Sequence, residues 1–335
     1  MSKKTIKIWI PVLSILAILI VAFIISKKQN EVVRIGHLGI ASHLPLYVAE
    51  QNGFFRENKI DAKLIRFSSS SSMIDALLSG NLEVGYELGT DAVLNVLIRD
   101  KQAFKIFHFT ISKKGASHDA LLIKKGARFP IQGSGRLVRV GIFPGPTATA
   151  MTKIILRKAY NLEQDKNFQM QQLPPTIQLQ ALEQGQIDVL FTYEPYVSEI
   201  VTRNIGQILI SGPVEEHVIN PWPGGCGVLS KKLFIQSPKT CDKVADAIYK
   251  AFSYIETNRN ESLAILEKYL NTPADVAKNI MFTSHWKSSS LRDYMTTNMD
   301  PLIKLNDYVR FLVENIIINE SVDISDYLYN EKNKQ

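Results

Sequence analysis

Small hydroxyl side chains stand where two expected strands turn into helices, a placement that suits hydrogen bonding to a small ligand. Thr147 and Thr149 follow a glycine in one such turn, and Ser69 and Ser70 belong to a five-serine run in another. A helix start exposes free backbone N–H groups and a positive dipole end, which favour an anion or a carbonyl oxygen. The ordinary alternative is that these hydroxyls only cap their own helices. We retain both pairs as candidate ligand contacts, with Ala148 between the threonines.

A carboxylate and two aromatic rings form a second group of candidates. Glu194 follows an expected strand end and precedes Pro195, which starts the next helix. Its carboxylate either receives an amine or amidine N–H from a ligand or caps its own helix, because acids favour that end. Tyr193 and Trp222 either stack on a ligand or pack in the core. We retain Glu194 and Trp222 as ligand-binding candidates.

The histidines and cysteines show no pattern that indicates catalysis or a metal. None of the six histidines has a partner at metal-ligand spacing, so His37 and His43, which flank the first strand–helix turn, are expected in ordinary roles. Cys226 and Cys241 are expected as reduced, buried thiols, with a disulfide as the alternative in an oxidising compartment. Neither a Gly-x-Ser-x-Gly elbow nor a phosphate loop occurs. We therefore expect no catalytic residue, metal or cofactor.

A nine-residue phrase occurs twice, 105 positions apart, at 76–84 and 181–189. Each copy reads as the last turn of a helix, a glycine that stops it, an acid and a short strand. Two such units predict two α/β lobes. Ligands of open α/β sheets bind beyond the carboxyl ends of the strands, here Gly89 and Thr90 in the first copy and 192–195 in the second. Both ends line one cleft if the lobes face each other.

The order of the expected elements supports this architecture. Strands are expected at 32–38, 62–67, 84–87, 104–109, 137–143, 168–173, 189–191, 207–210 and 228–230. Helices alternate with them, and further helices fill the chain beyond 239. This alternation predicts mainly parallel sheets flanked by helices in each lobe. We expect a discontinuous first lobe over 31–118 and 213–335, carrying the C-terminal helices, and a second lobe over 119–212.

The net charge of +7 does not indicate nucleic-acid binding, because most of it lies at the amino terminus. Residues 1–28 hold five lysines and no acid, which leaves +2 for the rest. Residues 8–25 form an apolar run flanked by lysines and just long enough to span a bilayer. We expect 1–30 to be an N-terminal signal-anchor, with a cleaved signal peptide as the alternative. The remainder is then in the periplasm or on the outer face of the cytoplasmic membrane.

Taken together, several short words resemble a known family. They are Arg34-Ile35-Gly36-His37, Leu46-Tyr47-Val48-Ala49, Gly53-Phe54-Phe55, the two repeat copies, Val140-Gly141-Ile142 with Gly145, and Tyr193-Glu194-Pro195. They are similar to words in the solute-binding proteins of ABC importers for nitrate, sulfonates, taurine and the thiamine pyrimidine. The resemblance implies a two-lobed periplasmic binding protein fold of type II. It implies ligand contacts at His43, Leu44, Ser69, Ser70, Gly89, Thr90, Thr147, Ala148, Thr149 and Glu194.

The resemblance also implies a function and partners. We expect an extracytoplasmic substrate-binding component, without enzyme activity, that captures a small organic solute and delivers it to a membrane permease. A monomer is expected. One alternative is an enzyme on the same fold, although the relatives that make the thiamine pyrimidine carry a cysteine-rich iron-binding word that two isolated cysteines do not form. Another is a membrane-tethered sensor domain. The tyrosine at 193, where the family more often has tryptophan, leaves the ligand open.

Overall fold

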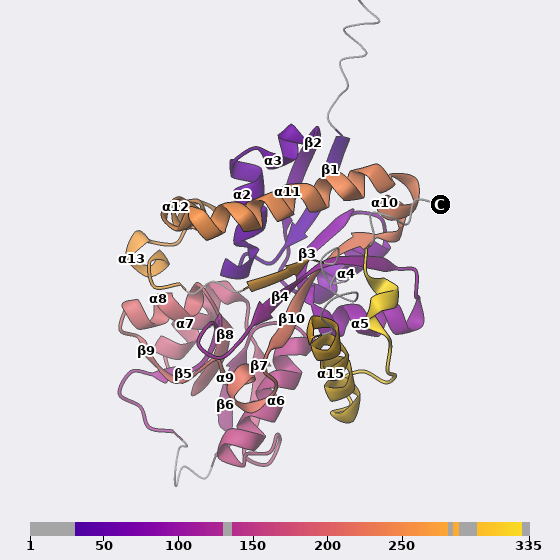
Figure 1. The fold of residues 1–335 in the computed structure, drawn as a ribbon. Coiled ribbons are helices and arrows are strands. Elements are labelled where there is room, and N and C mark those ends of the chain that lie inside the picture. Colours follow the sequence, from indigo (N-terminus) through magenta and orange to yellow (C-terminus); the bar gives the residue numbers. More distant parts are fainter. Residues whose placement is uncertain (1–30, 130–135, 281–283, 288–299, 330–335) are drawn as a thin grey trace, which may run out of the picture.

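The computed structural model describes residues 31–129, 136–280, 284–287 and 300–329. The apolar run at 8–25, expected to be a membrane anchor or signal, lies outside these ranges. Within them, no helix is both long and apolar enough to cross a bilayer. The described chain forms two separate sheets with helices packed against them (Figure 1).

The first sheet has six strands in the order β11-β4-β10-β3-β1-β2. They are β1 (Glu31–His37), β2 (Ile60–Arg66), β3 (Val84–Gly89), β4 (Phe104–Ser112), β10 (Trp222–Ser230) and β11 (Ser284–Lys287). The chain therefore returns to this sheet after building most of the second one. That return confirms the expectation that the strand near 228–230 rejoins the first sheet.

Helices cover both faces of the first sheet. One face shares a core with α2 (Leu44–Gln51), α3 (Phe54–Glu57), α11 (Pro238–Thr257) and α12 (Arg259–Leu270). Figure 1 shows α11 running along this face beside α2. The other face packs against α4 (Ser70–Leu78), α5 (Thr90–Arg99) and α15 (Asp300–Glu314). In α11 the buried residues Val244, Ile248 and Ala251 recur at helical spacing, which is why this polar-surfaced segment forms a packed helix.

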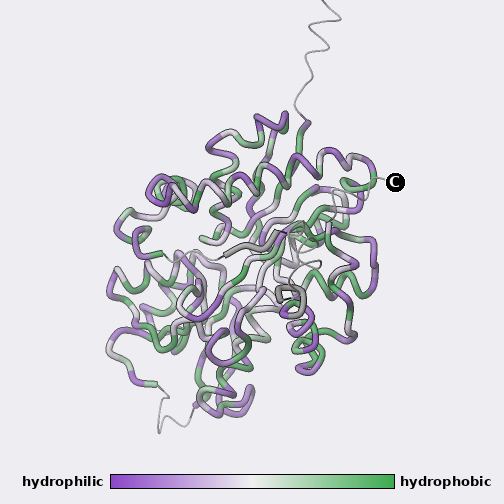
Figure 2. Tube along the Cα trace, viewed as in Figure 1, coloured by the Kyte–Doolittle hydropathy of each residue, from purple (hydrophilic) through white to green (hydrophobic). Residues whose placement is uncertain are grey.

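The second sheet has five strands in the order β7-β6-β8-β5-β9. They are β5 (Asp119–Lys124), β6 (Val138–Ile142), β7 (Phe168–Gln172), β8 (Val189–Tyr193) and β9 (Gly206–Ser211). Its helices are α6 (Pro146–Tyr160), α7 (Pro175–Glu183), α8 (Tyr196–Thr202) and α9 (Pro213–His217). Smaller elements are η1 (Ala41–His43), α10 (Lys231–Gln236), α13 (Ala274–Ala277) and η2 (Ile324–Tyr327). Figure 2 shows apolar residues gathered along the strands and hydrophilic residues on the outer helix turns.

Both sheets are mixed, so the expectation of mainly parallel sheets is wrong. Only β1 pairs in parallel with β2 and β3, and β6 with β7 and β8. The physical reason lies in β10 and β5, which each arrive from the other sheet and insert between two strands, antiparallel to both. A strand that arrives this way needs no crossover helix in its own sheet, so the rule that makes successive strands parallel does not apply to it.

The repeated phrase builds the same clamp in each sheet. The Arg34 backbone N–H and Nε both donate to Glu83 Oε2 at 2.9 Å, and its Nη2 donates to the carbonyl of the helix-stopping glycine at 2.8 Å. Arg139 makes the same bonds to Asp188 Oδ2, at 2.9 and 3.2 Å, and to the second glycine at 2.7 Å. The arginine on β1 or β6 therefore fastens the helix end and the acid of each copy to the strand that pairs with the copy's own strand.

Candidate functional site

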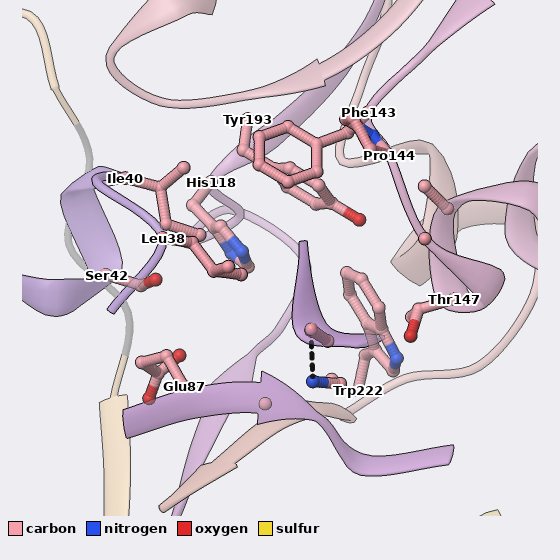
Figure 3. Close-up of a pocket in the computed structure, with 16 residues that line it drawn as sticks. Leu38, Ile40, Ser42, Glu87, His118, Phe143, Pro144, Thr147, Tyr193 and Trp222 are labelled. Carbon is pink, nitrogen blue, oxygen red and sulfur yellow. Dashed lines mark hydrogen bonds between the residues drawn. The ribbon is translucent and has the colours of Figure 1, made fainter. Parts of the chain in front are cut away.

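A cavity of about 50 Å³ lies between the two sheets, and both contribute to its walls (Figure 3). The segments of the first sheet supply Leu38, Ile40, Ser42, Ser70, Glu87, Gly89, Trp222, Gly224 and Gly225. The segments around the second sheet supply His118, Phe143, Pro144, Gly145, Thr147, Ala148 and Tyr193. The carboxyl ends of β3 and β8 meet here, as the repeat predicts.

Glu87 gives the cavity its only carboxylate among the described lining residues. It lies in a bulge of β3, where Tyr86 and Glu87 together stand opposite Gly227 of β10. Its φ of 58° is left-handed, which a non-glycine residue rarely adopts. Such a bulge re-aims a side chain, and here it directs the carboxylate toward β4, where Thr110 Oγ1 donates to Oε1 and His108 Nε2 lies 3.3 Å away.

His43, an expected ligand contact, lies behind this bulge and does not line the cavity. Its Nε2 stands 3.1 Å from both the Tyr86 carbonyl oxygen and the Leu38 nitrogen. Complete burial holds the pKa of His43 well below its usual range, so the ring is neutral. Leu44, also expected at the ligand, is buried in the core of the first sheet. His43 therefore supports the cavity floor from outside.

Three aromatic rings form one wall of the cavity. The His118 ring is stacked with Tyr193 at 5.3 Å between centroids and with Trp222 at 6.0 Å. Burial lowers the pKa of His118 to about 4, so the imidazole is uncharged at neutral pH. Figure 3 shows the Tyr193, His118 and Trp222 side chains around the space, with Ser42 and Glu87 on the left of the view. This wall offers flat surfaces to a ring-bearing ligand.

The structure brings five of the expected site residues together in the cavity lining: Ser70, Gly89, Thr147, Ala148 and Trp222. The hydroxyls among them already have partners. Ser70 Oγ accepts from the Gly89 N–H at 3.2 Å, and Thr147 Oγ1 donates to Asp91 Oδ1. Both bonds fix the geometry of the strand ends and helix starts around the cavity.

Three further expected residues lie beside the cavity instead of lining it. Ser69 caps α4 by accepting from the Ser72 N–H at 3.2 Å, and Thr149 Oγ1 donates to the Gly145 carbonyl at 2.9 Å. Both side chains border an adjoining groove of about 1320 Å³. Thr90 is completely buried at the start of α5. Of these three hydroxyls, that of Ser69 caps a helix as the alternative expects, whereas that of Thr149 bonds to a carbonyl one turn earlier.

Glu194 also has the capping role rather than a place in the cavity. Its carboxylate accepts from the Ser198 N–H at 2.9 Å and the Ser198 hydroxyl at 2.8 Å, at the start of α8. Its side chain borders a different space of about 210 Å³. Burial raises the pKa of Glu194 to about 7. Its backbone carbonyl accepts from the Ala41 N–H at 2.9 Å and so joins the two halves.

Sequence reasoning missed Glu87, His118 and most of the apolar lining. For Glu87 a signal exists: it is the one charged residue in the otherwise apolar, buried strand β3. His118 follows a loop and gives no such signal. Cys226 and Cys241 are free and buried, as expected. No cluster of three or more metal-ligating side chains occurs within the described ranges.

The fold is similar to that of solved solute-binding proteins. The alkanesulfonate-binding protein SsuA from Xanthomonas axonopodis pv. citri, bound to MOPS, matches with a TM-score of 0.68 and 14% identity over 90% of this chain and 99% of that one. The periplasmic nitrate-binding protein NrtA from Synechocystis PCC 6803 matches with 0.67 and 14% identity over 90% and 87%. The desulfurization enzyme DSZB matches with 0.62 and 11% over 90% and 97%. The expected periplasmic binding protein fold is confirmed.

No curated protein sequence gives a significant match. The sequence profile described as the NMT1-like family matches residues 26–267, more than two thirds of the chain. That range contains every described residue that lines the cavity and all strands of both sheets except β11. The chain therefore belongs to the NMT1-like family.

Proposed function

We propose that the protein is the extracytoplasmic substrate-binding component of an ABC importer, which captures a small organic solute between two lobes. The observation that carries the proposal is the cavity, because its walls come from both sheets. A ligand held there bridges the two halves and stabilises their closed arrangement over an open one. The sulfonate- and nitrate-binding proteins with this fold support the same role.

The proposed lobes are 31–118 with 218–335, and 119–217, which moves α9 from the first lobe, where the sequence placed it (213–335), to the second. The two crossings of the chain between the sheets form the hinge. Contacts away from the hinge are already made in this structure. Arg66 Nη2 donates to the Tyr196 hydroxyl at 3.3 Å, and Asn279 Nδ2 donates to Thr202 Oγ1 at 3.4 Å. The second crossing comes after α9, since α9 packs on α6 and β5. The arrangement corresponds to the closed state of such a protein.

In this proposal the loaded, closed protein acts as a monomer and delivers its solute to a membrane permease. It works outside the cytoplasmic membrane, and residues 8–25 anchor it there or direct its export. Catalysis on the same fold, as in DSZB, has less support from the cavity. A nucleophilic hydroxyl needs a base beside it, whereas the partner of Ser70 Oγ is a donor, the Gly89 N–H.

Isothermal titration of the purified full-length chain tests the proposal. Taurine, nitrate and an aminopyrimidine represent the expected solute classes, and one class should bind saturably without being converted to product. Ser42→Leu places a larger side chain in the cavity and should abolish that binding. Ser253→Leu, the same change at an exposed position of α11, should leave it intact. Binding that survives Ser42→Leu, or turnover of a bound solute, contradicts the proposal.

A further inference from the structure

We propose that Glu87 selects the ligand by charge, so that this cavity takes a cation or a group rich in N–H donors and rejects an anion. The inference deepens the proposed function and rests on it. It rests on three independent features of the described residues: a strained bulge that aims Glu87, glycines that leave room for its carboxylate, and the absence of a cationic side chain from the cavity lining.

The first feature is the bulge. In a regular β3 the Glu87 side chain would follow the usual alternation between the two faces of the sheet. The extra residue opposite Gly227 changes the direction of this side chain. A left-handed, non-glycine backbone costs about 1–3 kcal/mol and persists only where the surroundings impose it. Here the buried His43 ring packs behind the bulge, with Nε2 3.1 Å from the Tyr86 carbonyl oxygen. The fold therefore maintains a costly conformation whose effect is to place this carboxylate in the cavity lining.

The second feature is the glycine run of β10. A Cβ on Gly225 would stand 2.6 Å from Glu87 Oε2, and a Cβ on Gly227 would clash with the His108 ring. Both glycines are therefore needed for the Glu87 and His108 side chains to occupy their places. Thr110 and His108 engage Oε1, and the Ser42 hydroxyl also faces this carboxyl group, so a donor in the cavity would reach Oε2 beside Gly225.

The third feature is charge. The described lining contains Glu87 and no lysine or arginine, and His118 is neutral. Lys153 and Arg157 border the adjoining groove, not the cavity. A sulfonate or nitrate placed here would meet a carboxyl group without a compensating cation, which is unfavourable in a buried site. An amidinium or aminopyrimidine-like group donates N–H bonds to Oε2 and lies flat on the aromatic wall.

The charge preference is tested with three planar probes of nearly equal shape: benzamidinium, benzamide and benzoate. Titration into the full-length protein should give at least tenfold tighter binding of benzamidinium than of benzamide, and the weakest binding for benzoate. Glu87→Gln keeps the shape, removes the charge and should erase the preference. Glu50→Gln, the same change on α2 outside the cavity, should preserve it.

The outcomes separate the two proposals. If benzoate binds as tightly as benzamidinium in the wild-type protein, the inference about Glu87 is overturned, whatever the folding of the variants. If that benzoate binding is lost in Ser42→Leu, the cavity still binds solutes and the proposed function stands. If none of the probes binds, the inference also fails, and the proposed function is judged by the solute titration alone.

Discussion

The Thr147 hydroxyl donates a hydrogen bond to Asp91 Oδ1 and so joins the first turn of α6 to the first turn of α5. The two helices belong to different sheets and contact each other. Asp91 is completely buried, and this burial raises the pKa of its carboxyl. The Thr147–Asp91 hydrogen bond therefore connects the two proposed lobes, and Thr147 also lines the cavity.

This contact leads to a prediction for Gly89, which faces Thr147 across the interface between α5 and α6. A Cβ on Gly89 would clash with Thr147 Oγ1. Gly89→Ala should therefore hold the lobes apart and weaken solute binding about tenfold or more, because the closed arrangement carries the ligand contacts. Small-angle scattering should show a larger radius of gyration, while thermal unfolding shows that the protein still folds.

The double variant provides the control for that prediction. Thr147→Ala removes the oxygen that the new methyl group would meet, so Gly89→Ala in the Thr147→Ala background should cost much less affinity than in the wild type. A double-mutant cycle measures this coupling between the two positions. Equal losses in both backgrounds would show that Gly89 acts through something other than contact with Thr147.

A second prediction concerns proton release at Glu87. Burial raises the pKa of Glu87 well above its usual range, so its carboxyl keeps a proton to higher pH than an exposed glutamate does. The groups around it are His108 and Thr110 of β4, Ser42 of η1 and the Cys226 thiol of β10. A bound cation stabilises the carboxylate and lowers this pKa, so binding should be accompanied by proton release from Glu87.

Titration of benzamidinium in phosphate and in Tris measures this release, because the two buffers differ in ionisation enthalpy. The observed heat should differ between the buffers for the wild-type protein. It should not differ for Glu87→Gln, which has no proton to lose, or for neutral benzamide. Identical heats in both buffers for wild type and benzamidinium would show that Glu87 does not change its protonation on binding.

Most of the fold could be predicted from the repeated phrase, because that phrase is a local sequence pattern. A helix end, a glycine and an acid are adjacent in the chain, and the structure uses them for the same clamp twice. The direction of β5 and β10 was not predictable in this way. Each pairs with strands distant in sequence, so its orientation depends on how the chain crosses between sheets.

The site was predicted less well than the fold, and the reason is physical. A hydroxyl or acid at the start of a helix can either bind a ligand or cap the helix. Only the tertiary contacts decide which of the two it does. Helix caps or backbone bonds occupy the side chains of Ser69, Thr149 and Glu194. Ser70 and Thr147, in contrast, line the cavity. Glu87 depends on a bulge set by pairing with β10, which no local pattern announces.

A third prediction concerns the buried acids Asp119 and Glu215 beside the hinge. Burial, followed by repulsion from Glu215, raises the pKa of Asp119 well above its usual value. The folded state thus binds more protons than the unfolded state between the usual and the raised pKa, and stability falls as pH rises through that window. Because ionisation of a buried carboxyl opposes folding, the loss is greatest on the alkaline side of the window.

Asp119→Asn should remove this loss, because an amide is uncharged at every pH and its N–H donates to Glu215. The variant should be at least about 1 kcal/mol more stable than wild type at pH 8 and should approach it near pH 4, at the acidic end of the window. Urea unfolding across pH 4 to 8 makes the comparison. Parallel pH profiles for the two proteins would show that Asp119 is not the titrating group.

The last prediction uses the two clamps as matched experiments, one in each sheet. Glu83 accepts charge-assisted bonds from Arg34, and Asp188 accepts them from both Arg136 and Arg139; those bonds hold both carboxyl pKa values below their usual range. Glu83→Gln and Asp188→Asn leave the arginine partly buried without its counter-charge, so each should lower the free energy of unfolding by about 1–3 kcal/mol at pH 7. A depressed folded pKa stabilises above the unfolded value and loses that contribution as pH falls, so both penalties should shrink toward pH 3. Urea denaturation at pH 7 and pH 3 tests both variants, and a penalty that persists unchanged at pH 3 would mean that packing rather than charge fastens the helix ends.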